Sequence, residues 1–140
     1  ADEETTRVML AVAKREEEGC LYSEHIDNFP CEDLRTIDQL WVKYSDGKFG
    51  FSVQKRIYNG LGGTREYNHK IWEKFGDKVG WRKGGGWLYY KDITFDRKSP
   101  EGNLPIEALW QWLRLETFVR LGWVDEVDCL LSCLFSRRDL

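Results

Sequence analysis

Segment 29–54, FPCEDLRTIDQLWVKYSDGKFGFSVQ, places the strongest constraint on the fold. In its first half the apolar residues recur every three or four positions, which is the spacing of one buried face of a helix. These residues are Leu34, Ile37, Trp41 and Tyr44. Pro30 suits the first turn of such a helix, and Gly47 is available for a left-handed cap at its end. The segment therefore predicts an amphipathic helix with one buried face.

A second short helix is predicted directly after this one. Val53 and Ile57 are four residues apart, and Gly60 follows at the point where the pattern ends. Gly50 lies between two phenylalanines, and a residue without a side chain lets another element approach the backbone closely. We therefore expect a close contact at Gly50.

Further periodic segments predict further helices. The first is Ala1–Lys14, and the next is expected to begin with Thr64 as its cap. The stripe of that second helix is Tyr67, Ile71, Trp72 and Phe75. One more helix is expected to begin at Pro105 and another to cover Asp125–Phe135, with a frayed tail at 137–140. These stripes predict an all-α fold, a compact single domain of short helices.

Two irregular loops interrupt the helices. Leu21–Pro30 mixes apolar and polar residues, so its apolar side chains either anchor the loop to the core or form the rim of an apolar ligand site. Arg82–Phe95 contains three consecutive glycines and then several aromatic residues, which favours a mobile aromatic loop. The alternative is that Trp87 and Phe95 belong to the core and only the tyrosines are exposed.

Composition narrows the class of protein. At 140 residues the chain is long enough for one domain, residues 1–140, with its own core. Aromatic residues make up 14% of the chain, more than a small core needs, which favours an aromatic-lined surface. The net charge of −3 provides no basic field, so nucleic acid is not an expected partner. The chain has no signal peptide and no apolar run of about 18 residues, and it begins inside an expected helix, as a processed or trimmed form would.

No pattern in the chain predicts catalysis or a bound metal. The two histidines, His25 and His69, lie in unrelated contexts, and the paired carboxylates suit helix N-termini. The glycine triplet lacks the strand, helix and lysine of a phosphate-binding loop. The four cysteines form no ligand framework, so buried thiols are the better interpretation. We therefore expect a binding module and not an enzyme.

Five blocks of sequence, in the same order, resemble those of a known family. They are FPCEDLRTIDQLWVKYS (29–45), KFGFSVQKRIY (48–58), VGWR (79–82), WLYYKDITFD (87–96) and SPEGNLP (99–105). Over roughly residues 1–105 the chain resembles the genomes uncoupled four family, small porphyrin-binding proteins that activate magnesium chelatase in chlorophyll synthesis. Members usually carry a further short helix before the helix at Ala1–Lys14, and without it part of the apolar face of Ala1–Lys14 is expected to lack a cover.

The resemblance implies a fold and an activity. The two loops would form a concave surface on an all-helical core, and a porphyrin would lie in it. The protein would bind protoporphyrin IX and Mg-protoporphyrin IX without an intrinsic cofactor, and would stimulate the chelatase by contact with its large porphyrin-binding subunit. A plastid or cyanobacterial cytoplasm is the implied location. A monomer is expected, and peripheral membrane association is left open.

A porphyrin is a flat apolar disc with two carboxylate arms, so its site needs aromatic and aliphatic faces and a basic edge. By position, Ile26 matches a ligand-facing aliphatic residue of the family and Tyr90 a ligand-facing tryptophan. Leu104 lies in a block where the family has histidine and this chain has Asn103. Beyond Pro105 the sequence diverges from the family. Gln111 or Arg114 is assigned to the carboxylate arms only from its position in the sequence after this block. The predicted site residues are Tyr22, Ile26, Phe29, Arg82, Trp87, Tyr90, Leu104 and Arg114.

Two alternatives use the same aromatic surface. One is a binder of bilins, the open-chain tetrapyrroles. The other is a protein-interaction sensor module whose surface meets a polypeptide. Arg82 also has two interpretations, since it could meet the carboxylate arms or brace the fold through Asp77.

Overall fold

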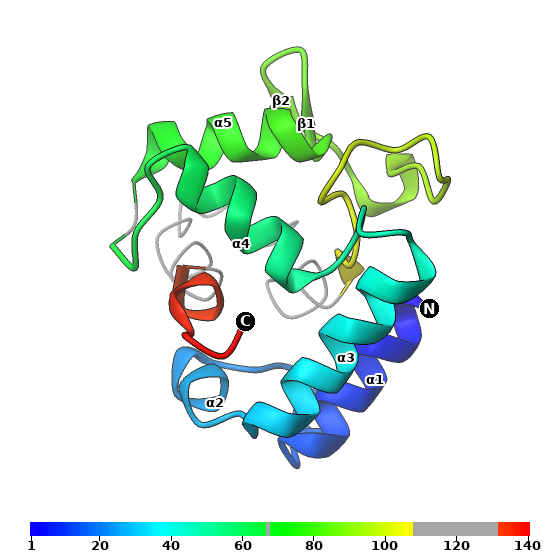
Figure 1. Ribbon diagram of the computed structural model, residues 1–140, viewed down its shortest axis with the longest axis vertical. Coiled ribbons are helices and arrows are strands. Elements are labelled where there is room, and N and C mark those ends of the chain that lie inside the picture. The colour runs from blue at the N-terminus through cyan, green and yellow to red at the C-terminus, as the bar shows by residue number, and fades with distance from the viewer. Residues whose placement is uncertain (67, 108–131) are drawn as a thin grey trace.

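The computed structural model describes residues 1–66, 68–107 and 132–140. Within them the chain forms a mostly helical compact domain, which confirms the predicted all-α class (Figure 1). Its elements are α1 (Asp2–Val12), α2 (Ser23–Asp27), α3 (Cys31–Tyr44), α4 (Phe51–Gly60), α5 (His69–Val79), the strands β1 (Arg82–Lys83) and β2 (Gly86–Trp87), and the 3-10 turn η1 (Tyr90–Asp92). Residues 132–136 are also helical. No helix of the described ranges is long and apolar enough to cross a membrane.

α3 begins and ends where the sequence predicts. Pro30 precedes its first turn, and Leu34 and Ile37 on its stripe are buried. Gly47 has a φ of +80° beyond its end, and its N–H donates to the Val42 carbonyl at 2.8 Å. Tyr44, at the far end of the stripe, is exposed.

The close contact predicted at Gly50 joins α3 to α4. Gly50 has a φ of +133°, and a Cβ placed there would lie 2.8 Å from Asp38 Oδ1. The same oxygen accepts the backbone N–H of Ser52 at 2.8 Å, so Asp38 satisfies a donor of the first turn of α4. A side chain at position 50 would displace this carboxylate.

The predicted start of α5 is wrong. Asn68 is the N-cap, and its side-chain oxygen accepts the N–H of Ile71 at 3.2 Å. Thr64 instead lies in the preceding turn, where its carbonyl accepts the hydroxyl of Tyr58 at 2.9 Å. That hydrogen bond ties residue 64 to α4, so the chain needs four more residues before α5 can begin. Tyr67, the first residue of the predicted stripe, lies outside the described residues.

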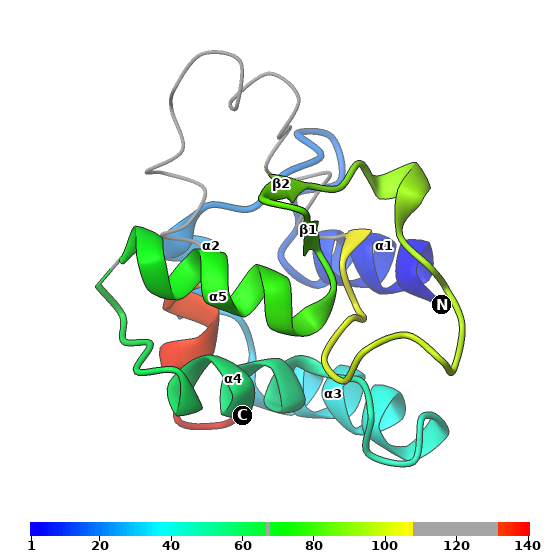
Figure 2. The same ribbon diagram turned by 90° about the horizontal axis from the view of Figure 1, so that it is seen from above.

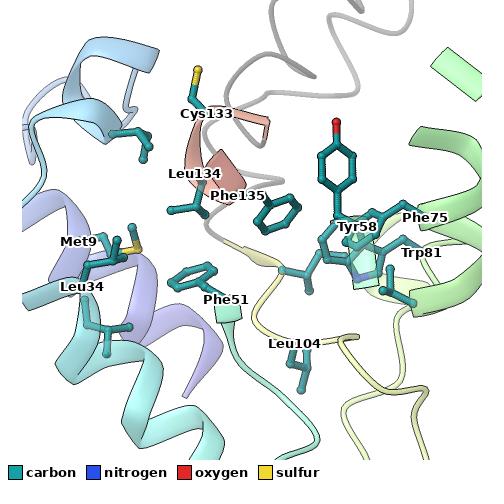
Figure 3. Packing of buried hydrophobic residues seen from close by; sticks show 14 of the residues in the cluster. Met9, Leu34, Phe51, Tyr58, Phe75, Trp81, Leu104, Cys133, Leu134 and Phe135 are labelled. Atoms are coloured by element: carbon teal, nitrogen blue, oxygen red, sulfur yellow. The ribbon is translucent and has the colours of Figure 1, made fainter. Parts of the chain in front are cut away.

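One hydrophobic core joins the helices of the described residues. Figure 3 shows side chains of α1, α3, α4, α5 and the C-terminal helical turn converging on one another. The ring of Phe75 is fully buried and contacts four other aromatic rings. These are Tyr58, Trp72, Trp81 and Phe135. Much of the aromatic content therefore lies in the core.

Both loops contain short regular elements. The first contains α2, and the second is a hairpin followed by η1 (Figures 1 and 2). Gly84 and Gly85 have φ values of +60° and +82°, which is the backbone of a tight type I′ hairpin turn. The glycines therefore close a defined turn. The prediction that Phe95 is in the core is wrong, since that ring is 50% exposed.

Candidate functional site

The first loop, residues 21–30, directs most of its apolar side chains inward. Ile26 and Phe29 are 1% and 3% exposed and belong to the core. Tyr22 is exposed, and the guanidinium of Arg15 lies 5.5 Å from its ring centroid. The backbone N–H of Tyr22 donates to His25 Nδ1 at 2.9 Å. Of the three site residues predicted in this loop, Tyr22 is the one on the surface.

Arg137 holds the first loop in place. Its Nη1 donates to the carbonyls of Ile26 and Phe29 at 2.8 and 2.6 Å, and its Nη2 donates to Asp139 at 2.6 Å. The Arg137 side chain is buried, and the Asp139 carboxylate beside it raises the pKa of the guanidinium. The prediction of a frayed tail is wrong for this reason. No spacing in the sequence distinguishes Arg137 from Arg138, so sequence reasoning missed it.

The second loop, residues 82–95, presents aromatic rings at its surface. Trp87 is half-buried and stacks on Trp72 of α5, with ring centroids 5.6 Å apart. Tyr89 is exposed, with Lys91 Nζ 5.8 Å from its ring centroid. Tyr90 is half-buried and meets Phe95 edge to face, with centroids 5.3 Å apart. This loop therefore offers both a packed ring and exposed rings.

A buried carboxylate, Asp2, holds the second loop. Its Oδ2 accepts the hydroxyl of Tyr90 at 3.1 Å and the N–H of Glu107 at 2.8 Å, and its Oδ1 accepts the N–H of Ile106 at 2.8 Å. Burial raises the pKa of Asp2, against the opposing effect of these donors. Burial and the nearby Asp2 charge also raise the pKa of Tyr90. The sequence signal at Asp2 was only that of an acidic residue at a helix start, which it shares with Glu3 and Glu4.

Arg82 is occupied by ion pairs. Its Nη1 lies 3.1 Å from both carboxylate oxygens of Asp77, and its Nη2 lies 3.7 Å from Glu73 Oε1. The geometry matches the interpretation in which Arg82 braces the fold. Lys83 and Lys91 are exposed on the same loop. They are basic groups within reach of an anionic ligand at this surface.

Leu104 and Asn103 are both buried. The side-chain nitrogen of Asn103 donates to the Val79 carbonyl at 2.7 Å, and the backbone carbonyl of Asn103 accepts the indole N–H of Trp81 at 2.7 Å. In this position, where the family has histidine, the asparagine joins α5 to the chain before Pro105. Arg114 and Gln111 lie outside the described residues.

An apolar groove of about 680 Å³ lies between α1 and α3. The indole N–H of Trp41 donates to Thr5 at 2.9 Å across its floor. Its exposed apolar side chains are Leu40, Tyr44 and Phe95. Leu104 lies at this groove and not on the second loop's surface. The part of the chain that the structure describes holds no group of three or more His, Cys, Asp or Glu that could bind a metal ion.

In the described part of the chain, a mostly helical domain presents an aromatic surface loop that carries two exposed lysines. The sequence profile of the GUN4-like family matches residues 1–120, and the chain belongs to this family, as its sequence blocks predict.

Several relatives resemble this chain. It is 40% identical over 87 residues to a Ycf53-like protein of Synechocystis, which covers 61% of this chain and 34% of the relative. It is 35% identical over 85 residues to the chloroplastic tetrapyrrole-binding protein of Arabidopsis thaliana, covering 59% of this chain and 29% of that protein. The chain thus spans about a third of the length of these relatives.

A solved structure shares the fold. The ligand-free structure of Arabidopsis thaliana GUN4 superposes with a TM-score of 0.72 at 27% identity, covering 99% of this chain and 83% of that one. GUN4 from Chlamydomonas reinhardtii gives a TM-score of 0.71 at 22% identity. These matches place the described helices in the same arrangement as in GUN4.

Proposed function

We propose that this domain is a non-enzymatic tetrapyrrole-binding regulator whose ligands are protoporphyrin IX and Mg-protoporphyrin IX. The observation that carries the proposal is the second loop, where Trp87, Tyr89 and Tyr90 lie beside two exposed lysines on a GUN4-like fold. The Arabidopsis relative is named as a tetrapyrrole-binding protein. One relative comes from a cyanobacterium and another is a chloroplast protein. They support a location of this protein in a cyanobacterial cytoplasm or in a plastid.

The chemistry of the ligand fits this loop. The face of the macrocycle needs rings to lie against, and the tyrosines supply them. Its two carboxylates are ionised at neutral pH and need cations, because an unpaired buried carboxylate is costly. Lys83 and Lys91 are exposed for this role, whereas Arg82 would have to exchange its contacts with Asp77 and Glu73. The lysines therefore replace Arg82 as our first candidates for the carboxylate arms.

The expected affinity is moderate. Burying several hundred square ångströms of macrocycle gives a gross gain of about 10 kcal/mol at about 25 cal/mol/Å². Ordering of the loops and loss of ligand freedom offset much of this gain, so we expect micromolar or somewhat tighter binding.

Absorbance titration tests the proposal. Addition of protein to protoporphyrin IX should shift the main absorption band and quench tryptophan fluorescence, since Trp87 lies on the proposed surface. Competition with a bilin separates closed from open tetrapyrroles, and stronger binding of the bilin would favour the alternative ligand. An unchanged band at protein concentrations of about 100 µM would refute tetrapyrrole binding and leave a polypeptide as the partner of this surface.

The regulatory step concerns magnesium chelatase. We propose that the loaded domain, as a monomer, stimulates the enzyme by contact with the large porphyrin-binding subunit, and that peripheral membrane association belongs to the same role. Chelatase assays with and without this protein test it. A rate that does not change at saturating protein would limit the function to tetrapyrrole binding.

A further inference from the structure

We propose that Asp2 is a positioning residue for the second loop, so that tetrapyrrole affinity depends on this carboxylate through Tyr90. The inference rests on the proposed function for its effect on affinity. Three segments that are distant in sequence meet at Asp2: α1, η1 and the chain that follows Pro105.

The donors around Asp2 explain why this position requires a carboxylate. Its two oxygens accept three hydrogen bonds, from the hydroxyl of Tyr90 and the backbone N–H groups of Ile106 and Glu107. A carboxylate is an acceptor at both oxygens, whereas an amide would turn an NH₂ group toward one of these donors. Asp2 is 6% exposed, so water cannot easily replace a lost partner. Asparagine at position 2 should therefore keep the shape, retain an acceptor at one oxygen and lose the acceptor at the other.

The contact with Tyr90 reaches the surface that the proposed ligand would use. Tyr90 begins η1, directly after the exposed ring of Tyr89 and before Lys91. Its hydroxyl is fixed at Asp2, and its ring is fixed against Phe95. The strand end of the loop is held separately, by the stacking of Trp87 on Trp72. Loss of the Asp2 contact should therefore loosen η1 while the hairpin remains in place.

The electrostatic surroundings of Asp2 oppose its charge. Burial raises its pKa, and Glu107 and Glu3 are acidic neighbours of the cluster. The carboxylate of Glu107 is itself held by the hydroxyl of Thr6 at 3.3 Å. The buried carboxylate of Asp2 is stabilised by the groups that donate hydrogen bonds to it. Loss of any one of these donors should therefore weaken the contact between Asp2 and the second loop.

The test compares Asp2→Asn, Tyr90→Phe and the double variant with the wild type. Glu4→Gln is the control, because it removes one negative charge from the same turn of α1 at an exposed side chain. Amide hydrogen exchange of residues 88–93 is measured without ligand, and the Kd for protoporphyrin IX is measured per folded molecule. Melting temperature is recorded for all variants.

We expect Asp2→Asn to speed exchange at 88–93 and to weaken protoporphyrin binding about fivefold to tenfold, the size of the net contribution of one ordinary hydrogen bond. Tyr90→Phe should weaken binding less, and the double variant should be no weaker than Asp2→Asn, because Tyr90→Phe removes only the contact through which Asp2 acts on the loop. Glu4→Gln should match the wild type.

Additive effects of the two substitutions, or a lowered melting temperature with unchanged exchange and Kd, would overturn the inference. If Asp2→Asn does not fold, the exchange of Tyr90→Phe tests the inference by itself. Faster exchange at 88–93 supports the role of the Asp2–Tyr90 contact, and unchanged exchange refutes it. If the wild type binds no tetrapyrrole, the proposed function fails. The exchange measurement needs no ligand and still decides whether Asp2 holds the loop.

Discussion

The two loops that the sequence predicts as one ligand surface are fixed in opposite ways. In the first loop a cation, Arg137, donates to backbone carbonyls, and the side chains Ile26 and Phe29 fill the core. In the second loop an anion, Asp2, accepts a side-chain hydroxyl, and the rings of Tyr89 and Phe95 remain exposed. A loop held by its backbone and its core residues is part of the scaffold. A loop held through a few side-chain contacts, with exposed rings between them, can adapt to a ligand.

Arg137→Ala should have the largest effect on stability. It removes a charged donor from the carbonyls of Ile26 and Phe29 and leaves Asp139 without its counter-charge. Hydrogen bonds to a charged group contribute about 1.5–3 kcal/mol each, so we expect a loss of about 3–5 kcal/mol. Urea unfolding measures the free energy. Arg138→Ala is the matched control, because this neighbour is exposed. A loss equal to that of the control would mean that the tail does not hold the first loop.

Ile26→Ala tests whether the first loop is scaffold or ligand surface. Its side chain is 1% exposed in the core, so truncation should lower the free energy of unfolding by about 2–4 kcal/mol. We expect the Kd for protoporphyrin IX, per folded molecule, to remain within about twofold of wild type. Tyr22→Ala, at an exposed ring in the same loop, should hardly change stability. A large loss of affinity with little loss of stability would restore Ile26 as a ligand contact.

Lys91→Ala and Arg82→Ala separate a ligand cation from a structural one. Lys91 is exposed beside Tyr89, and its loss should weaken binding of the free-acid porphyrin by under about 1 kcal/mol, an effect that salt should reduce. The porphyrin diester has no carboxylates, so it should bind this variant and the wild type alike. Arg82→Ala should instead lower stability, because it removes the contacts of the guanidinium with Asp77 and Glu73. Equal acid-to-diester ratios for wild type and Lys91→Ala would exclude Lys91 from the carboxylate arms.

Glu107→Gln should have the smallest effect, and one that depends on pH. Burial and then the charge of Asp2 raise the pKa of Glu107 above its ordinary value of 4.5. Folding therefore favours the protonated carboxyl of Glu107. The free energy of unfolding of the wild type falls as pH rises through the raised pKa, because the carboxyl must then ionise in the folded state. The glutamine variant has no such loss and should be slightly more stable at pH 7, by under about 1 kcal/mol, and equal to wild type near pH 4. Unfolding at both pH values measures this, and a greater advantage at the lower pH would contradict it.

Local patterns were sufficient for much of the helical architecture. The stripe of α3, the helix after Gly50 and the contact at Gly50 follow from spacing and from the absence of a side chain. The start of α5 was missed because Thr64 and Asn68 are both good caps, and a hydrogen bond from Tyr58 occupies the backbone at Thr64. Choosing between two such caps requires knowledge of a contact with another helix.

The candidate site was harder to predict for the same reason. Aromatic content and loop position indicated the second loop, but they could not separate exposed Tyr89 from half-buried Tyr90, or packed Trp87 from exposed Phe95. Arg82 was visible as a cation near the loop, but its pairing with Asp77 depends on how β1 returns along α5.

The sequence by itself determined the helical class, the family and the two loops, because these depend on periodicity and on blocks of neighbouring residues. Only the tertiary structure decided what holds each loop. Arg137 reaches residue 26 and Asp2 reaches residue 106, across 111 and 104 positions of sequence. A buried charge is stable only where the fold brings its donors or acceptors together, and the residues beside it in the sequence do not indicate which groups those partners are.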